Sequence, residues 1–251
     1  MSDSDQPIPA ATLVVMRETT TGAPELLMAE RAAAMRFAGG ALVFPGGRID
    51  LGDHALAAHL PGDAEDNAAR IAAVRETLEE AGLAIGCDCD AAAIPEGRAM
   101  LHDGVPFGEV LARIGGRLRL DALVPYARWL PPSGSLHRIF DTRFYLAAAP
   151  TNLPEPSADG SENTRIFWAS AQAVLDDADA GRATIIYPTR RNLERLVRYA
   201  SFDEARADAA AHEVRTISPW IEPRDGVDHL CIPEGLGYPV TAERLDRAVR
   251  A

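Results

Sequence analysis

The chain has 251 residues, of which 47% are hydrophobic, so it is long enough to bury a sizeable core in one large domain or in one domain with an appendage. Its formal net charge is −12 at pH 7, which argues against nonspecific binding to nucleic acid because no dominant positive field can replace the condensed counterions. No run of about 18 apolar residues occurs and the first residues are polar and acidic, so neither a membrane-spanning helix nor a signal peptide is expected.

The three cysteines, Cys87, Cys89 and Cys231, form an odd and sparse set. In a chain without an export signal, such a set predicts reduced thiols and a cytoplasmic location. One residue separates Cys87 from Cys89 and no second pair follows, so a zinc site is not expected.

Hydrophobic patterning predicts alternating strands and helices along the chain. Strands are expected over residues 11–16, 25–29, 42–44, 127–130 and 141–148. Helices are expected over a segment that ends near Ala81, over 169–178 and over 190–211. Residues 88–127 contain further helical patterning, and the alternation as a whole favours an α/β sandwich.

The stretch of residues 75–83 places three carboxylates on one helical face. Glu76, Glu79 and Glu80 stand at offsets of zero, three and four, which one face of an α-helix brings together. Gly82 follows as a stop signal. The opposite face carries apolar residues that would hold the helix against a core: Ile71, Val74, Leu78 and Ala81.

Crowded carboxylates raise one another's pKa, so this arrangement is costly unless a divalent cation sits among them. A site for a hard cation is the first interpretation. The alternative is a solvated helix face on which Arg75 pairs with Glu79 one turn further along.

Just upstream, an apolar run over residues 41–44 leads into Gly46 and Gly47. Two adjacent glycines can adopt φ > 0 or bring the backbone close to a ligand. The pattern therefore predicts a strand that enters a binding loop.

Together, the two segments resemble the Nudix hydrolase signature, which reads Gly, five residues, Glu, seven residues, then Arg-Glu-aliphatic-any-Glu-Glu-any-Gly-aliphatic. Gly47 fits the first position, and the second half is matched by Arg75, Glu76, Glu79, Glu80, Gly82 and Leu83. Asp53 stands where the pattern has Glu, and 21 residues rather than seven separate it from the matched arginine. The extra segment contains the break Pro61-Gly62 and is expected to be a surface excursion, which leaves open whether Asp53 reaches a metal.

A second resemblance, to the coenzyme A diphosphatases within that family, lies just before this box. The spacing of their motif is kept by Arg31, Arg36, Gly40 and residues 44–47. Met28 and Ala29 replace its Leu and Thr, while the long insertion and residues 137–145 add to the resemblance. Arginine suits bidentate phosphate contacts, so Arg31 and Arg36 could bind the phosphates of coenzyme A. The alternative is ordinary surface arginines in a chain that contains no lysine.

These resemblances imply an α/β/α sandwich of the Nudix type, with a mixed sheet, a helical insertion and a C-terminal helical extension. The hydrolase domain is expected over residues 8–190, with insertions at about 54–66 and 88–127. The helical extension is expected over residues 191–251 and would pack on that domain.

By the same resemblance, Mg²⁺ or Mn²⁺ would be bound by Glu76, Glu79 and Glu80. The catalytic set would add Arg75, which is expected to orient the carboxylates by pairing with Glu79. The substrate would be bound by Arg31, Arg36, Gly46 and Gly47, and the carbonyl of Gly46 is a further candidate metal ligand. Glu162 is a candidate for a loop carboxylate that completes the site, with an ordinary exposed glutamate as the alternative.

The implied reaction is hydrolysis of the diphosphate linkage of coenzyme A or acyl-coenzyme A by a metal-activated water, giving 3′,5′-ADP and (acyl-)4′-phosphopantetheine. One alternative substrate is another nucleoside diphosphate derivative, such as ADP-ribose, a dinucleotide or an oxidised nucleotide. Another alternative is a ligand sensor of the same fold without turnover, which would not need the carboxylate cluster. The expected partner is a small molecule that contains a nucleoside diphosphate, with no nucleic acid and no membrane, and a homodimer is one open state of assembly.

His137 is expected to be a structural or surface residue rather than a catalytic one. The tryptophans are expected in core or groove packing, at Trp129, Trp168 and Trp220. Phe140 and Tyr145 could instead line a nucleotide pocket.

Overall fold

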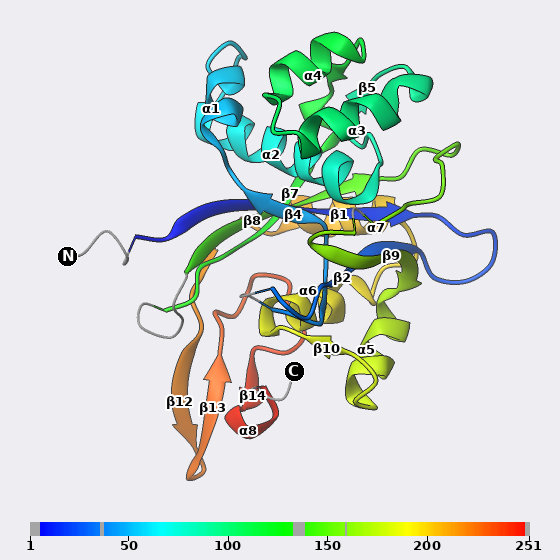
Figure 1. The fold of residues 1–251 in the computed structure, drawn as a ribbon. Coiled ribbons are helices and arrows are strands. Elements are labelled where there is room, and N and C mark those ends of the chain that lie inside the picture. Colours follow the sequence, from blue (N-terminus) through cyan, green and yellow to red (C-terminus); the bar gives the residue numbers. More distant parts are fainter. Residues whose placement is uncertain (1–5, 36–37, 133–138, 159, 249–251) are drawn as a thin grey trace.

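The computed structural model describes residues 6–35, 38–132, 139–158 and 160–248, in which a mixed sheet lies between two layers of helices (Figure 1). Nine of the described strands form this sheet, in the order β10-β3-β2-β1-β8-β7-β11, with β4 also paired to β1 and β9 to β2. Their bounds are β1 Ile8–Arg17, β2 Glu25–Arg31, β3 Ala41–Val43, β4 Gly46–Arg48, β7 Val124–Trp129, β8 Phe140–Ala148, β9 Asn163–Ser170, β10 Thr184–Ile185 and β11 Thr216–Ile217. The predicted α/β class with a mixed sheet is confirmed.

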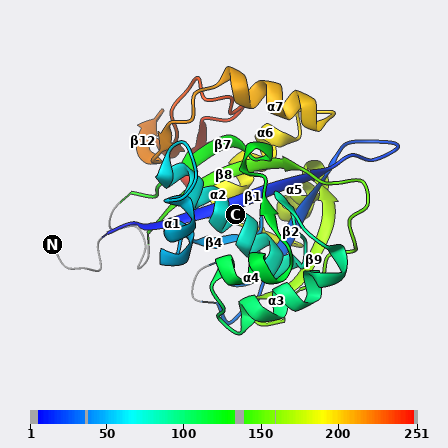
Figure 2. The same cartoon turned by 90° about the horizontal axis from the view of Figure 1, so that it is seen from above.

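Helices cover both faces of the sheet (Figures 1 and 2). The first layer consists of α1 Leu51–Ala57, α2 Ala64–Ala81, α3 Ile94–His102 and α4 Phe107–Arg113. The second layer consists of α5 Ala171–Asp179, α6 Tyr187–Leu196 and α7 Phe202–Ala211. No helix within the described ranges is long and apolar enough to cross a membrane.

Strand β1 supplies side chains to both hydrophobic cores, because four consecutive apolar residues point alternately to the two faces. Leu13 and Val15 are fully buried in the core that α2 closes. Val14 and Met16 lie in the core that α5 and α6 close. The sheet is therefore buried on both sides at its centre.

Strand β1 changes its hydrogen-bonded partner along one of its edges. Within the described strands, β1 pairs with β2 at Met16 and Arg17, whereas at its other end it pairs with β4 over Ala10 to Thr12. On its second edge β1 runs parallel to β8 along nearly its whole length. The change of partner along the first edge leaves β4 free to approach α2.

Helix α2 carries the predicted carboxylate stretch, and its apolar face is confirmed. All four expected core residues are buried: Ile71, Val74, Leu78 and Ala81. The helix ends at Ala81, and Gly82 closes it in the left-handed conformation with φ of 69°. At the other end, Asp63 caps the helix by accepting hydrogen bonds from the N–H groups of Glu65 and Asp66.

The segment expected as a surface excursion, residues 54–66, is only partly one. Most of helix α1 and the first turn of α2 lie in it, and Ala57 is 1% exposed. Apart from Ala55, the exposed residues of this segment are residues 58–65, around the predicted Pro61-Gly62 break. The excursion is shorter than expected because Asp63 caps the start of α2.

The second predicted insertion contains the expected helices, α3 and α4, beside a short pair of strands, β5 Cys87–Asp88 and β6 Arg117–Leu118. Its C-terminal bound differs from the expected 127. Strand β7 begins at Val124 and pairs with β8 inside the main sheet. Residues from Val124 onward therefore belong to the main sheet. The helical pattern before them gave no sign of where the insertion ends.

The single helix expected over 190–211 is two helices, α6 and α7. Ser201 and Glu204 explain the break, because the Ser201 hydroxyl accepts from the Glu204 N–H while the Glu204 carboxylate accepts from the N–H of Ala200. Such reciprocal capping starts a new helix.

The C-terminal extension is helical only as far as Ala211 and again in α8 Leu245–Ala248. Between them lies a three-stranded antiparallel sheet that projects below the main sheet in Figure 1 and consists of β12 Trp220–Arg224, β13 Val227–Cys231 and β14 Ala242–Arg244. Asp225 and Gly226 form the tight turn between β12 and β13, with φ of 51° and 77°. An Asp-Gly pair is a preferred two-residue hairpin turn, so the predicted helical extension is correct only in part.

Candidate functional site

A cleft of about 1530 Å³ lies where β1 changes partner, and it is larger than the roughly 300–1000 Å³ typical of small-molecule sites. Strand β4 lines it together with Glu76 and Glu79 of α2. The connection between α3 and α4 also lines it, as do Trp129 and Phe144 and the start of α6.

The two glycines of β4 are required by close approach. A Cβ on Gly46 would lie 2.4 Å from the carbonyl oxygen of Ala11. A Cβ on Gly47 would lie 2.4 Å from the carboxyl carbon of Glu76. Neither glycine has a positive φ, so the first of the two expected reasons for the Gly-Gly pair does not apply. The pair forms a strand that sits directly against the carboxylate helix.

Glu76 and Glu80 are held in surroundings that disfavour their charge. Burial raises the pKa of Glu76 to about 7, with Arg75 opposing and Glu79 adding to the rise. Burial and the charge of Glu76 raise the pKa of Glu80 to about 8, although hydrogen bonds from Asn163 and from the Gly46 N–H oppose this. Since Glu80 is only 5% exposed, the alternative of a solvated carboxylate face does not describe it.

Arg75 links the helix to the loop after β4. Its Nε and Nη2 donate to the two carboxylate oxygens of Asp53 at 3.1 and 2.9 Å, and its Nη1 donates to Glu76 at 2.7 Å. Glu79, its expected partner, lies further away, at 3.7 Å. Burial would lower the pKa of Arg75, but Asp53 and Glu76 outweigh burial and raise it.

Both carboxylate oxygens of Asp53, which replaces the glutamate of the signature, accept hydrogen bonds from Arg75. Asp53 also accepts from the Asp50 N–H at 2.9 Å, and its side chain is 1% exposed. These contacts anchor Arg75 despite the enlarged connection to α2.

Arg31, at the end of β2, lines the cleft as expected. Its Nη2 lies 3.8 Å from Glu162, and its buried Nε has no hydrogen-bond partner among the described residues. Glu162 also lines the cleft, with 58% of its side chain exposed. Arg36 and His137 lie outside the described residues.

Three residues at the site were missed by the sequence analysis. Asn163, at the start of β9, hydrogen-bonds Glu80. Arg98 of α3 donates to the carbonyl oxygens of Glu79 and Glu80 at 2.8 and 2.7 Å. His102, at the end of α3, lies 4.0 Å from the Glu79 carboxylate. No local pattern marks them, because each contact joins segments far apart in the chain.

The aromatic residues divide between the cleft and the cores. Trp129 lines the cleft while donating from its indole to the Tyr238 hydroxyl at 3.2 Å, and Phe140 also lines the cleft. Tyr145 does not line it; its hydroxyl donates to Asp66 on the α2 side. Trp168 packs under the guanidinium of Arg17, and Trp220 is 43% exposed on β12.

The donor set can be tested against a divalent cation. Glu76 and Glu79 present carboxylate oxygens, the ligands that hard cations prefer, to the cleft. Across the described ranges, no group of three or more His, Cys, Asp or Glu side chains is placed to hold a metal ion by itself. The two lining carboxylates match an ion such as Mg²⁺, which keeps several waters and binds through one or two carboxylates and substrate phosphates.

Charge supports the same conclusion. The described lining contains three arginines: Arg31, Arg48 and Arg75. It contains five carboxylates: Asp50, Asp53, Glu76, Glu79 and Glu162. An anionic ligand would therefore be repelled unless a cation or proton first reduced the negative charge.

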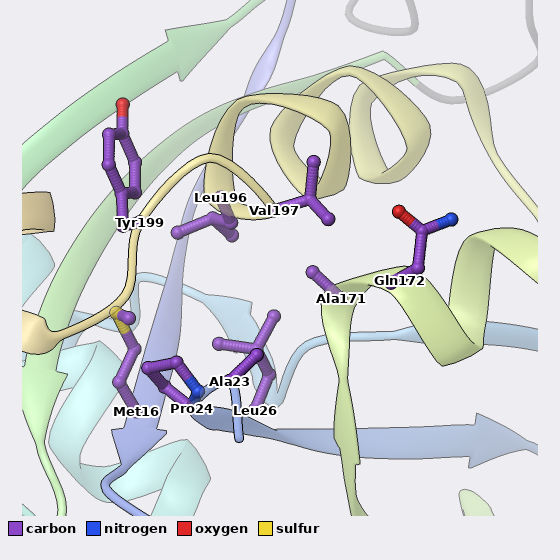
Figure 3. A pocket seen from close by; sticks show the side chains of 9 residues that line it. All are labelled: Met16, Ala23, Pro24, Leu26, Ala171, Gln172, Leu196, Val197 and Tyr199. Carbon is purple, nitrogen blue, oxygen red and sulfur yellow. The ribbon is translucent and has the colours of Figure 1, made fainter.

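A second hollow, drawn in Figure 3, lies between the turn before β2 and the ends of α5 and α6. It offers only about 10 Å³, which is room for a single water. Its described lining is mostly apolar, with Leu26, Leu196 and Tyr199 among the lining residues. It is a packing gap rather than a second binding site.

Comparisons with known proteins show which sequences and folds this chain is similar to. No family model matches the sequence. The crystal structure of a NUDIX hydrolase from Alicyclobacillus acidocaldarius is similar with a TM-score of 0.71 and 30% identity, over 80% of this chain and 96% of that one. Among curated proteins, the putative nudix hydrolase 7 of Caenorhabditis elegans is 28% identical over 198 residues, which are 77% of this chain but only 62% of the nematode protein. The acyl-coenzyme A diphosphatase NUDT19 of Gallus gallus is 23% identical over 257 residues, covering 78% of this chain and 67% of the bird protein.

Proposed function

The chain belongs to the Nudix hydrolase family, and on this basis we propose that it hydrolyses the diphosphate linkage of coenzyme A or acyl-coenzyme A. The products would be 3′,5′-ADP and (acyl-)4′-phosphopantetheine. One observation carries the proposal: Arg31, from the motif resembling coenzyme A diphosphatases, lines the same cleft as Gly47 and Glu76 of the hydrolase signature. The name of the chicken relative, an acyl-coenzyme A diphosphatase, supports the same substrate class.

In this reaction a water oxygen bonds to one phosphorus, the bridging P–O bond to that phosphorus breaks, and a proton leaves to solvent. A divalent cation such as Mg²⁺ or Mn²⁺, when bound, would neutralise the diphosphate and lower the pKa of a bound water. One or two of its ligands would come from Glu76, Glu79 and Glu80, of which Glu76 and Glu79 line the cleft, with the Gly46 carbonyl as a further candidate. Glu162 is the candidate loop carboxylate.

The remaining residues would prepare this site. Arg75 holds the Glu76 carboxylate in place through its 2.7 Å hydrogen bond, while Asp53 fixes Arg75 from the other side. The Gly46 N–H fixes Glu80 at 3.0 Å. Arg31 would bind the phosphates of the substrate with its positive charge. Its Nε has no hydrogen-bond partner among the described residues.

The raised pKa values of Glu76 and Glu80 argue against a sensor without turnover. Glu80 is buried and Glu76 half-buried, and two carboxylates that resist ionisation destabilise the fold at neutral pH unless a cation binds. A binding module has no need of that arrangement.

The site is tested by Glu79→Gln, which removes a carboxylate that lines the cleft and leaves the apolar face of α2 intact. We expect metal-dependent turnover of coenzyme A to fall by at least about 100-fold with an unchanged melting temperature. The matched control is Glu65→Gln on the first turn of the same helix, where the side chain is 67% exposed, and it should retain wild-type turnover. Near wild-type activity in both Glu79→Gln and Glu80→Gln would refute the assignment.

A further inference from the structure

Arg48, the last residue of β4, carries a positive charge that is not paired with a carboxylate in the described ranges. Its side chain is exposed and lines the cleft. No side-chain hydrogen bond or ion pair joins it to a described residue. The other two arginines of the described lining are engaged, since Arg75 donates to Asp53 and Arg31 lies 3.8 Å from Glu162. The charge of Arg48 is therefore available to an anionic group of the substrate.

The backbone holds Arg48 at a fixed point beside the carboxylates. Its carbonyl oxygen accepts a hydrogen bond from Nη2 of Arg75 at 2.9 Å. The preceding residue, Gly47, sits against Glu76, where a Cβ would lie 2.4 Å from the carboxyl carbon. Successive side chains of a strand point to opposite faces, so the Arg48 side chain leaves β4 on the face turned away from Glu76. Arg48 is thus placed to contact a group next to the diphosphate rather than the cation.

A row of cleft-lining residues crosses the sheet from Arg48. The strand register pairs Arg48 with Ala10 of β1, Ala10 with Thr142 of β8, and Thr142 with Trp129 of β7. All four residues line the cleft. Neighbouring strands lie about 4.8 Å apart, so the backbones at the two ends of the row are separated by about 14 Å. The row is therefore long enough for a nucleoside that carries a phosphate.

Arg48 is the one charged residue of this row. The two residues in the middle of the row, an alanine and a threonine, have small side chains and leave room above the sheet. The carboxylates that follow Arg48 in the chain are directed to another arginine, because Asp50 and Asp53 lie 3.7 and 2.9 Å from Arg75. A phosphate bound at the row therefore meets a guanidinium without a carboxylate from the same row.

Coenzyme A differs from the alternative substrates by a third phosphate. Besides the diphosphate, it carries a phosphomonoester at the 3′ position of the ribose, where ADP-ribose has a hydroxyl. A phosphomonoester bears a charge of about −1.5 to −2 at pH 7, and a guanidinium can bind it through two parallel hydrogen bonds. When the diphosphate lies at Glu76 and Glu79, only the ribose separates it from the third phosphate. This phosphate therefore comes close to Arg48.

We infer that Arg48 is a specificity-determining residue that binds the 3′-phosphate of the substrate, while the nucleoside lies along the row from Ala10 to Trp129. This inference rests on the proposed function and adds a substrate preference to it. Nucleotides that carry a 3′-phosphate are hydrolysed in preference to the same nucleotides with a 3′-hydroxyl.

The test compares kcat and KM for coenzyme A and 3′-dephospho-coenzyme A with Mg²⁺. Wild-type kcat/KM should be at least about ten-fold higher for coenzyme A, as expected for a hydrogen bond between charged groups. In Arg48→Gln, kcat/KM for coenzyme A should fall by at least about ten-fold through a higher KM, and for the dephospho substrate by less than about three-fold. Arg48→Lys keeps the charge and should recover part of the preference.

Two further arginine variants serve as comparisons. Arg206→Gln also removes one positive charge, at a side chain that is 59% exposed outside the described cleft lining, and should keep the full preference. Arg31→Gln should reduce turnover of both substrates alike, because that residue is assigned to the diphosphate. A selective loss of coenzyme A turnover in Arg31→Gln instead of Arg48→Gln would overturn the inference.

The outcomes separate this inference from the proposed function. Equal wild-type kcat/KM for the two substrates would overturn the role of Arg48 and leave the proposed function standing. An equal loss on both substrates in Arg48→Gln, with an unchanged melting temperature, would do the same. Absence of wild-type turnover on both substrates would overturn the proposed function, and the role of Arg48 with it.

Discussion

At the scale of single residues, the ion pair of Asp53 and Arg75 holds the loop after β4 against the carboxylate helix. Both partners are buried, at 1% and 8% exposure, and both oxygens of Asp53 accept from the guanidinium. The pair therefore fixes Glu76, to which the same guanidinium donates. Removing one partner of such a pair leaves an uncompensated buried charge.

We expect Asp53→Asn to destabilise the fold by about 3 kcal/mol, measured by chemical denaturation, because Arg75 stays buried with a neutral partner. Asp50→Asn is the matched control. Asp50 lies 3.7 Å from the same guanidinium but its side chain is 56% exposed, and Asn serves equally well at a helix N-cap. The control should lose less than about 1 kcal/mol. Equal losses in the two variants would contradict the anchoring role of Asp53.

At this scale, the sequence predicts contacts between residues close in the chain but not those between residues far apart in it. The carboxylate face of α2 and the stop at Gly82 follow from local periodicity, and both were predicted. The pairing of Asp53 with Arg75 spans 22 residues across an enlarged connection, so only the fold could reveal it. Asn163 and Glu80, which are also in contact, lie even further apart in the sequence, and no motif marks them.

At the scale of elements, Arg98 joins three of them. From α3 it donates to the last carbonyls of α2, at Glu79 and Glu80, and to the hydroxyl of Ser157 at 2.7 Å in the loop that leads to Glu162. A cation at a helix C-terminus also interacts favourably with the helix dipole. The inserted helices are thereby tied to the metal-ligand candidates and to the loop carboxylate.

We expect Arg98→Ala to lower the melting temperature by several degrees and kcat for coenzyme A by at least about ten-fold, because the C-terminal turn of α2 loses its cap and the loop loses its anchor. Arg98→Lys should not restore activity, since a single ammonium cannot reach the acceptors that the guanidinium spans. Arg113→Ala on α4 is the control, because its pair with Glu96 is exposed. Wild-type kcat in Arg98→Ala would contradict the positioning role.

Element prediction failed where capping and turn chemistry mattered more than hydrophobic pattern. The helical pattern over 190–211 concealed the N-cap at Ser201, which divides it. The residues after Ala211 were predicted to be helical because the extension begins with helices. Asp225 and Gly226 instead form a hairpin turn between two strands. The β1, β2 and β8 strands were predicted because their apolar runs are continuous.

At the scale of the whole molecule, the cleft shares the negative charge of the chain. Five carboxylates face three arginines in its described lining, and Glu76 and Glu80 have pKa values raised from 4.5 to about 7 and about 8. Below about pH 4.5 these two glutamates are protonated in both the folded and the unfolded chain. As the pH rises, the unfolded chain ionises first, so the folded state loses relative stability until its own groups ionise.

Without a divalent cation, the protein should therefore become less stable between about pH 4.5 and pH 8, by on the order of 2 kcal/mol or more. Mg²⁺ should reverse this loss, since it binds the ionised carboxylates of the folded state, and its binding near pH 6 should release protons. Calorimetric melting at pH 5.5, 7 and 8.5 with EDTA or with Mg²⁺ measures both effects. Glu76→Gln should flatten the pH dependence, and a metal-free protein equally stable at all three pH values would contradict the account.

The central claim, that this cleft hydrolyses the diphosphate of coenzyme A or its thioesters, is tested most directly by identifying products. Free coenzyme A, acetyl-coenzyme A and ADP-ribose are each incubated with the protein and Mg²⁺ or Mn²⁺, and the products are identified by mass spectrometry. The account predicts 3′,5′-ADP and 4′-phosphopantetheine, or its acetylated form, from the coenzyme A substrates. Cleavage of ADP-ribose alone, or of none of the three, would contradict it.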